Sequence, residues 1–198
     1  MKANKFTGQI FKMLKESRIE SGLVFWAVAL FVCLVFIVTL GKEAAMVSST
    51  YGDRELPIYS VGIEEKKISI SFDAAWGAED FQKIMDVLDK HQIKTTFFMT
   101  GEWVEKYPDC VKMLVEKGHD LANHSATHPD MTTLSKEEQK KQIMEVHEAV
   151  KSLTGYEMEL FRPPYGAYNN DVIRTCYENN YYPVQWNVDI LDIKVKMM

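Results

Sequence analysis

The sequence predicts an α/β domain built on parallel strands and preceded by one membrane-spanning helix. Two observations predict this class. From about residue 57 onward, strand-like and helix-like segments alternate at least four times, and ahead of them lies one uninterrupted apolar run. Alternation of this kind favours parallel strands joined by right-handed crossovers, in a doubly wound sheet or a barrel. The 198 residues suffice for one globular domain but not for two large ones.

The apolar run occupies residues 23–40, LVFWAVALFVCLVFIVTL, and carries no charge. A helix that spans a bilayer needs about 17–25 apolar residues, and a buried core helix normally keeps a polar stripe, which this run lacks. Residues 1–22 hold five basic residues against two glutamates, so this end should stay cytoplasmic and the rest should lie outside. A cleaved signal peptide is the alternative, but its apolar region is usually about 7–15 residues long, so an uncleaved anchor is favoured.

The expected organisation therefore has four parts. A basic cytoplasmic segment at residues 1–22 leads into a transmembrane anchor at 23–41, and a short polar stalk at 42–56 leads into the folded domain at 57–198. The expected location is the cytoplasmic membrane, crossed once, with the C-terminal domain extracytoplasmic and the lipid bilayer as the partner of residues 23–41. The formal net charge of −5 and the lack of a long basic stripe argue against a nucleic-acid partner.

Within the folded domain, local sequence signals predict each element. Runs of β-branched and aromatic residues indicate strands, and apolar residues at 3–4 spacing indicate helices. The longest helix has the strongest signals, because Ser135 and Glu138 fit a capping box and Gly155 closes it. The expected elements are strands at 57–63, 68–72, 95–99, 120–123, 158–161 and 184–188, and helices at 78–91, 108–117, 135–153 and 169–179.

Four chemically reactive turns follow predicted strands. They read FDA at 72–74, NHSATH at 123–128, FRPPYG at 161–166 and WNVDILD at 186–192. Active sites of parallel α/β folds form at the carboxyl ends of the strands. The shared position of the four turns therefore predicts one site.

Taken singly, the residues of these turns are weak indications. His124 and His128 are four apart, which on a helical turn places both imidazoles on one side, able to bind one metal ion. Two histidines at this spacing, without further evidence, more often lie on the surface or cap a helix. Asp73 alone could cap the next helix, and Arg162 could be an ordinary surface arginine in a turn that two prolines stiffen. Their occurrence together favours the functional interpretation.

Together the turns resemble the motifs of the polysaccharide deacetylases, the NodB-like carbohydrate esterases. SFDAAWG resembles the first motif, HSATH the second, RPPYG the third and NVDILD the fourth. The resemblance runs from about Pro57 to Ile193, and the SFDAAWG variant, with PIYSV upstream, looks most like the spore-associated branch of endospore-forming bacteria. It implies a distorted (β/α) barrel of the NodB-homology type.

The resemblance also implies a role for each residue. The family removes acetyl groups from N-acetylated amino sugars in peptidoglycan or chitin, using a divalent metal that is usually zinc. His124 and His128 would be the metal ligands, and Asp73 the general base. Arg162 would pair with Asp73 and aim it, and the backbone N–H of Tyr165 would stabilise the oxyanion.

Two departures from the family pattern bear on activity. The family usually has a second aspartate as the third metal ligand, where this sequence has Ala74, and catalytic zinc normally has three protein ligands. Two histidines and waters then remain, unless Asp80 or Glu79 reaches the ion or Asp73 itself binds it and leaves the role of base vacant. Asp192 would orient the family's general-acid histidine, but the leucine–histidine motif that supplies it does not follow Ile193. The expectation is a domain truncated at its C-terminus, without its last strand and helix.

Three hypotheses follow. The first is a membrane-anchored, metal-dependent deacetylase of cell-wall glycan linked to sporulation. The second is a catalytically inactive, membrane-anchored glycan-binding or scaffold protein, favoured by Ala74 and the missing histidine. The third is a truncated gene product. In the first two, Trp76, Trp186 and Tyr165 could offer flat faces to a sugar ring, with plain core packing as the alternative for each.

Overall fold

The computed structural model describes residues 50–189 with the exception of residue 52. They belong to the second of two compact units, Met1–Val47 and Ser48–Met198. The predicted anchor at 23–41, the segment at 1–22 and Asp192 lie outside the described residues. No helix in the described part of the chain is long and apolar enough to cross a membrane.

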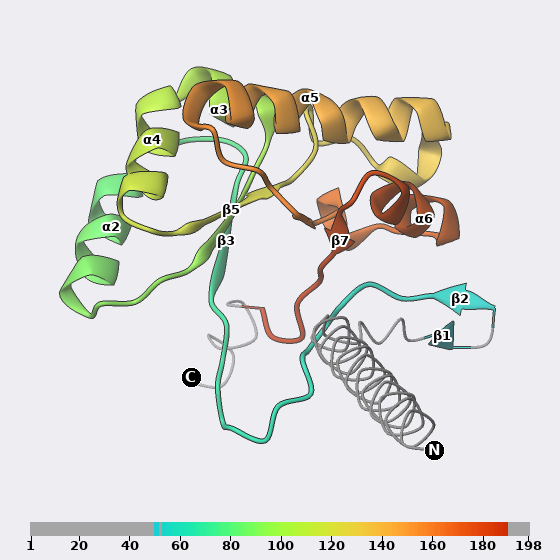
Figure 1. Ribbon diagram of the computed structural model, residues 1–198, viewed down its shortest axis with the longest axis horizontal. Coiled ribbons are helices and arrows are strands. Elements are labelled where there is room, and N and C mark those ends of the chain that lie inside the picture. Colours follow the sequence, from blue (N-terminus) through green and yellow to red (C-terminus); the bar gives the residue numbers. More distant parts are fainter. Residues whose placement is uncertain (1–49, 52, 190–198) are drawn as a thin grey trace, which may run out of the picture. The chain divides into compact units, whose positions relative to one another are not determined.

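A five-stranded parallel sheet forms the centre of the second unit (Figure 1). Its strands lie side by side in the order in which the chain makes them. A doubly wound sheet reverses direction beside its first strand, so this sequential order excludes that alternative and is the order found in a barrel wall. The strands are β3 (Ser71–Ala74), β4 (Thr96–Met99), β5 (Asp120–Asn123), β6 (Leu160–Phe161) and β7 (Tyr182–Pro183).

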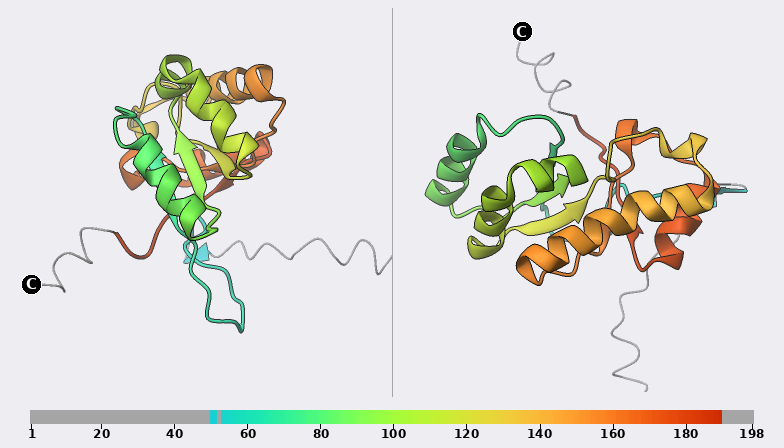
Figure 2. Two further views of the ribbon diagram at one scale, coloured as in Figure 1. Left: turned by 90° about the vertical axis from the view of Figure 1, so that its left-hand side faces the viewer. Right: turned by 90° about the horizontal axis from the view of Figure 1, so that it is seen from above.

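Helices fill the crossovers between these strands, and in Figure 1 α3, α4 and α5 lie together above the sheet. The longest, α5, contacts α3, α4 and α6, and Figure 2 shows it running beside α4 and α6. One face of the sheet is therefore covered. The helices are α2 (Phe81–Lys90), α3 (Gly101–Lys106), α4 (Pro108–Glu116), α5 (Lys136–Thr154) and α6 (Asn170–Glu178), with 3-10 turns η1 (Met131–Thr133) and η2 (Pro164–Gly166).

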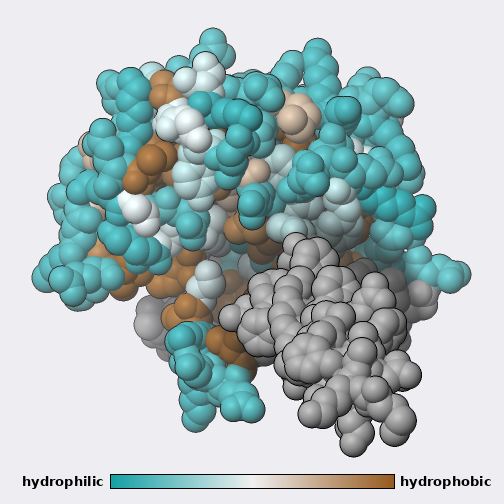
Figure 3. Space-filling view, in the orientation of Figure 1, coloured by the Kyte–Doolittle hydropathy of each residue, from teal (hydrophilic) through white to brown (hydrophobic). Residues whose placement is uncertain are grey.

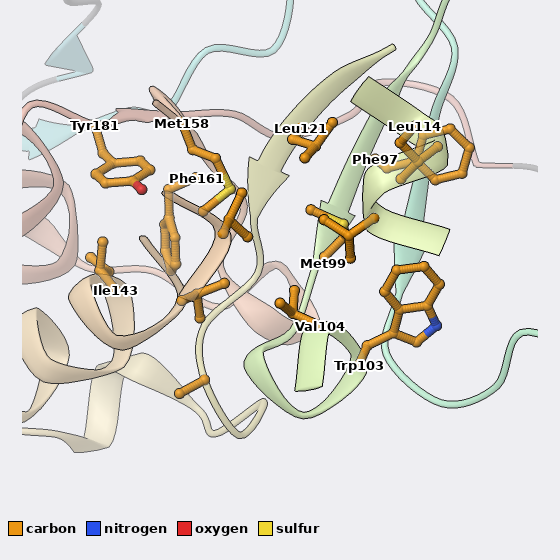
Figure 4. Close-up of a cluster of buried hydrophobic side chains, with 14 of the residues drawn as sticks. Phe97, Met99, Trp103, Val104, Leu114, Leu121, Ile143, Met158, Phe161 and Tyr181 are labelled. Carbon is orange, nitrogen blue, oxygen red and sulfur yellow. The ribbon is translucent and has the colours of Figure 1, made fainter. Parts of the chain in front are cut away.

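The hydrophobic core lies between the sheet and these helices (Figure 4). Phe97 and Met99 of β4 are buried against Trp103 and its neighbours in this core. Because side chains alternate along a strand, Phe98 points to the opposite face of the sheet. That opposite face carries the candidate site.

The predicted long helix is confirmed together with both of its ends. The Ser135 hydroxyl accepts the N–H of Glu138, and the Glu138 carboxylate accepts the N–H of Ser135. Gly155 closes the helix with φ of 74°, a conformation that favours glycine. Helix α3 was not predicted, because its six residues are too few to show a clear period and begin with glycine.

The predicted strand at 184–188 is wrong in position. The observed β7 comes earlier, and after it only Val184 continues, in an isolated parallel bridge to Ile58. Pro183 is tolerated because the N–H groups of Tyr182 and Val184 donate to β6 and its flank, while the carbonyl of Pro183 accepts from Ile58. The strand expected at 57–63 is reduced to that bridge.

Ahead of the bridge, a small antiparallel hairpin of β1 (Thr50–Tyr51) and β2 (Arg54–Glu55) lies at the end of the predicted stalk. Glu55 accepts a 2.7 Å bond from Arg174, and its N–H donates to Asn170 at 3.0 Å. This end of the stalk is therefore tied to α6.

The segment between Ile58 and β3 forms no regular element and exposes apolar side chains, among them Val61 and Ile68. Figure 3 shows a mainly hydrophilic upper surface and apolar side chains gathered lower on the same face. The surface over the helices is thus the polar one.

Replacing Ser135 with alanine should lower the free energy of unfolding by about 1 kcal/mol, because the Glu138 N–H loses its acceptor. The matched control is Ser152→Ala, at an exposed serine inside the same helix, where alanine should leave stability unchanged or slightly raise it. Urea unfolding followed by circular dichroism measures both. Equal losses in the two variants would contradict the cap.

Candidate functional site

An ion pair between Arg162 and Asp73 forms the centre of the site. Nη1 of Arg162 donates to Oδ1 of Asp73 at 2.6 Å, and Nη2 donates to the hydroxyl of Ser71 at 2.9 Å. Ser71 and Asp73 are two apart on β3, so both point to the same face of the sheet. The structure places Asp73 inside the strand rather than in the turn after it.

The guanidinium of Arg162 also lies over an aromatic ring. Its central carbon is 3.8 Å from the centroid of Phe98 and 5.6 Å from that of Trp186. The arginine side chain is 6% exposed and that of Asp73 is 38% exposed. A buried cation held by a carboxylate, a hydroxyl and an aromatic face is fixed in one direction. The alternative of an ordinary surface arginine is therefore wrong.

His124 follows β5 and has a defined tautomer. Its Nδ1 donates to the carbonyl oxygen of Arg162 at 2.7 Å, which leaves the lone pair on Nε2. Nε2 lies 3.9 Å from Oδ2 of Asp73, too far for a direct hydrogen bond. Burial lowers the pKa of His124, and the nearby Asp73 opposes that shift in part. The ring is therefore held uncharged, as a metal ligand must be.

His124 and His128 do come together, but not through a helical turn. Their ring centroids are 4.9 Å apart. Residues 124–128 form an irregular loop in which Ser125 and His128 have φ of 67° and 58°. The spacing of four residues therefore predicts the right pair, although the helical conformation expected from it is wrong.

Several hydrogen bonds hold this unusual loop in place. The Ser125 hydroxyl accepts the N–H of His128 at 3.1 Å, and the Asn123 side-chain oxygen accepts the N–H of Ser125 at 2.9 Å. The first N–H of α3, from Gly101, donates to the carbonyl of Ser125 at 3.0 Å. A Cβ on Gly101 would lie 3.1 Å from the Ala126 backbone, so this close approach favours glycine.

Aromatic side chains flank His128 on two sides. The centroid of Trp76 is 5.4 Å from the His128 ring, and that of Tyr165 is 4.6 Å from it. Trp76 is 74% and Tyr165 70% exposed, so neither is a core residue. Tyr165 lies in η2 with φ of 60°, and its N–H is at the start of that turn, where no partner exists within the turn.

The residues present fit a divalent ion only as a two-histidine site. In addition to the lone pair on His124, Nδ1 of His128 is buried without a hydrogen-bond partner in the described structure, and burial lowers the pKa of this ring too. Among residues 50–189 that are described, no three His, Cys, Asp or Glu side chains are grouped to hold a metal. Ala74 offers only a methyl group, and Asp80 pairs with Lys83 at 2.8 Å.

Five of the predicted site residues converge, and Asp192 lies outside the described residues. Ser71 and Phe98 were missed as partners of Arg162. Ser71 had a detectable signal, since it precedes Asp73 by two on one strand. The residues that the structure brings together are Asp73, His124, His128, Arg162 and Tyr165.

The fold and the site together define a parallel α/β protein that carries an arginine–carboxylate pair beside two imidazoles at its strand ends. The chain belongs to the polysaccharide deacetylase family, whose model matches residues 61–184, more than half of its length. The fold is the parallel-sheet α/β fold of that family.

Relatives in the family include enzymes and a protein that is not one. The chain is 35% identical to a peptidoglycan-N-acetylglucosamine deacetylase of Bacillus cereus, over 69% of this chain and 50% of the relative. It is 32% identical to a CE4 family pseudoenzyme from Bacillus anthracis, with a TM-score of 0.66 over 71% of this chain and 50% of the other. A mutant of a CE4 family pseudoenzyme with restored enzymatic activity is also similar, at 34% identity, a TM-score of 0.67, and coverage of 71% of this chain and 52% of the other. The chain spans about half the length of the curated relatives it matches.

Replacing Asp73 with asparagine should lower the free energy of unfolding by about 2 kcal/mol, because Arg162 is then buried without a counter-charge. The loss is moderate because water reaches the carboxylate. The control is Asp80→Asn, which breaks an exposed pair with Lys83 and should change stability little. Chemical denaturation at neutral pH compares them. An unchanged midpoint for Asp73→Asn would contradict the assigned coupling.

Proposed function

We propose that the domain removes acetyl groups from N-acetylated amino sugars of cell-wall polysaccharide. One observation carries this proposal: Asp73, aimed by a buried arginine, faces the lone-pair side of His124. A general base beside a metal ligand is what amide hydrolysis by an activated water requires. The deacetylase relative of Bacillus cereus supports the same chemistry.

Each side chain has a task in this reaction. Oδ1 of Asp73 is occupied by Arg162, so Oδ2 is the oxygen that takes the proton of the attacking water. The N–H of Tyr165 donates to the developing oxyanion. His124 and His128 would hold a divalent metal, with zinc the expected ion. When bound, such an ion polarises the amide carbonyl and lowers the pKa of water.

A catalytically inactive glycan-binding protein is the second candidate, and Ala74 favours it. The third ligand expected at a catalytic zinc is missing there, while the aromatic groups around His128 do not depend on a metal. The CE4 family pseudoenzyme from Bacillus anthracis, to which the chain is similar, supports the absence of catalysis in this candidate.

The location and the biological setting belong to the same proposal. The uncharged run and its basic flank support an anchor at 23–41 in the cytoplasmic membrane, with the domain outside it facing the cell wall. The SFDAAWG motif supports a link to sporulation, through its likeness to the spore-associated branch of the family.

The first test is acetate release from chitooligosaccharide by the full chain with added zinc, compared with His124→Ala. Release above this variant is expected, and its absence would remove the enzyme hypothesis for the natural chain. Ala74→Asp should raise zinc affinity by at least about tenfold, because a third ligand is added. The matched control is Ala75→Asp, which adds the same carboxylate one residue on. Calorimetric zinc titration should show no gain for this control.

The outcomes separate the two candidates. If only Ala74→Asp releases acetate, the natural chain is a glycan-binding protein with the remains of an active site. If neither releases acetate and neither binds zinc, both the metal site and the deacetylase proposal are wrong.

Replacing Trp76 with alanine should weaken chitooligosaccharide binding by roughly fivefold in Kd, about 1 kcal/mol, because an exposed flat ring beside His128 is lost. Val87→Ala is the control, since Val87 is an exposed apolar residue on α2 without a ring contact to the site. Calorimetry measures both in the absence of zinc. Equal affinities for the two variants would exclude Trp76 from the sugar site.

A further inference from the structure

A chain of hydrogen bonds runs from the protein surface into the core behind the candidate site. On the outside, Oε2 of Glu157 lies 3.0 Å from Nε2 of His147 on α5. Nδ1 of His147 lies 2.7 Å from the hydroxyl of Tyr181. The same hydroxyl lies 3.3 Å from Nδ2 of Asn123, which is fully buried at the end of β5. Figure 4 shows Tyr181 in the core near Phe161.

With a neutral His147, the hydrogen bonds of this network point in one direction. The amide Nδ2 of Asn123 is a donor, so the Tyr181 oxygen accepts from it. Burial raises the pKa of Tyr181, so the hydroxyl keeps its proton and donates it to Nδ1 of His147. That leaves the other imidazole proton on Nε2, where the Glu157 carboxylate accepts it. Each donor and acceptor in this hydrogen-bond network then has a suitable partner.

The inner end of the chain fixes the side-chain amide of Asn123. Nδ2 also donates to the carbonyl of Ile143 on α5 at 2.8 Å, while Oδ1 accepts the N–H of Ser125 at 2.9 Å. Rotating the amide by half a turn would place like groups together at Ile143 and Ser125, and also at Tyr181 as long as the tyrosine donates its proton to His147. Tyr181 therefore helps to select the orientation in which Asn123 can hold Ser125.

Ser125 needs such support because its backbone is strained. It and His128 have positive φ without being glycine, and such conformations persist only where the surroundings hold them. The Ser125 hydroxyl in turn accepts the N–H of His128. Releasing Asn123 would therefore loosen the turn between the two histidines.

We propose that Tyr181 and His147 are positioning residues that act through Asn123 to hold the loop at residues 124–128 in its ligand-presenting conformation. The idea that this loop presents metal ligands comes from the proposed function, and the positioning role rests on the proposed function in that one respect. The conformation itself can be measured without metal or substrate. The two proposals can therefore fail separately.

The test is Tyr181→Phe in the full chain, which removes the hydroxyl and keeps the ring. Amide hydrogen exchange at Ser125 and His128 should become about tenfold faster, the loss of roughly one buried hydrogen bond, with much smaller changes in α2. The matched control is Thr175→Val. Thr175 is equally buried, and its hydroxyl links α6 to α5 through Gln139 at 2.8 Å, without a bond to the loop.

A loop-specific acceleration in Tyr181→Phe that Thr175→Val lacks supports the positioning role. Equal acceleration in both variants, or none at the loop in Tyr181→Phe, overturns it, because a merely structural contact would act on the whole domain. His147→Ala is the second variant should Tyr181→Phe not fold, and it should speed the same amides to a smaller extent. Zinc affinity is measured alongside. A natural chain that binds no zinc counts against the proposed function and leaves the exchange result to decide the positioning role.

Discussion

The burial of one positive charge, that of Arg162, constrains the whole site. An ion taken out of water is costly unless it is paired and hydrogen-bonded, and this side chain is 6% exposed. Its partners come from different strands: Asp73 and Ser71 from β3, and the ring of Phe98 from β4. Its own carbonyl binds His124, which follows β5. Four neighbouring strands therefore have to end at one level for this charge to be paired, and that alignment brings Asp73, His124 and Arg162 together.

Features of the fold that depend on local chemistry are predictable from the sequence. The ends of α5 were predictable because a capping box and a C-terminal glycine are satisfied within a few residues. The convergence of Asp73, His124 and Arg162 was predictable because parallel strands present their carboxyl ends together. The strand after α6 was misplaced, because the observed strand contains Pro183 and the pairing that tolerates a proline there involves Ile58, far away in the chain.

What the sequence could not show is how the loop between the histidines is supported. HSATH has the spacing of a helical pair, and no local signal reveals positive φ at Ser125 and His128. The support comes from α3, from the Asn123 side chain and, through Tyr181, from α5. These contacts join residues up to 58 positions apart, so they are set by tertiary packing. The long-range polar network is the part of the site that only coordinates reveal.

Ala74 illustrates how packing and catalysis compete at this site. Ala74 follows Asp73 as the last residue of β3, and it packs, partly buried, against the hydrophobic core with Phe72. A carboxylate there would have to be partly desolvated before it could reach a metal, and only the bound ion would offset that cost. The methyl group of Ala74 therefore stabilises the metal-free domain at the expense of its affinity for a metal ion. The ion pair of Arg162 and the aromatic groups beside His128 need no such compensation, so the site can keep its shape whether or not an ion is bound.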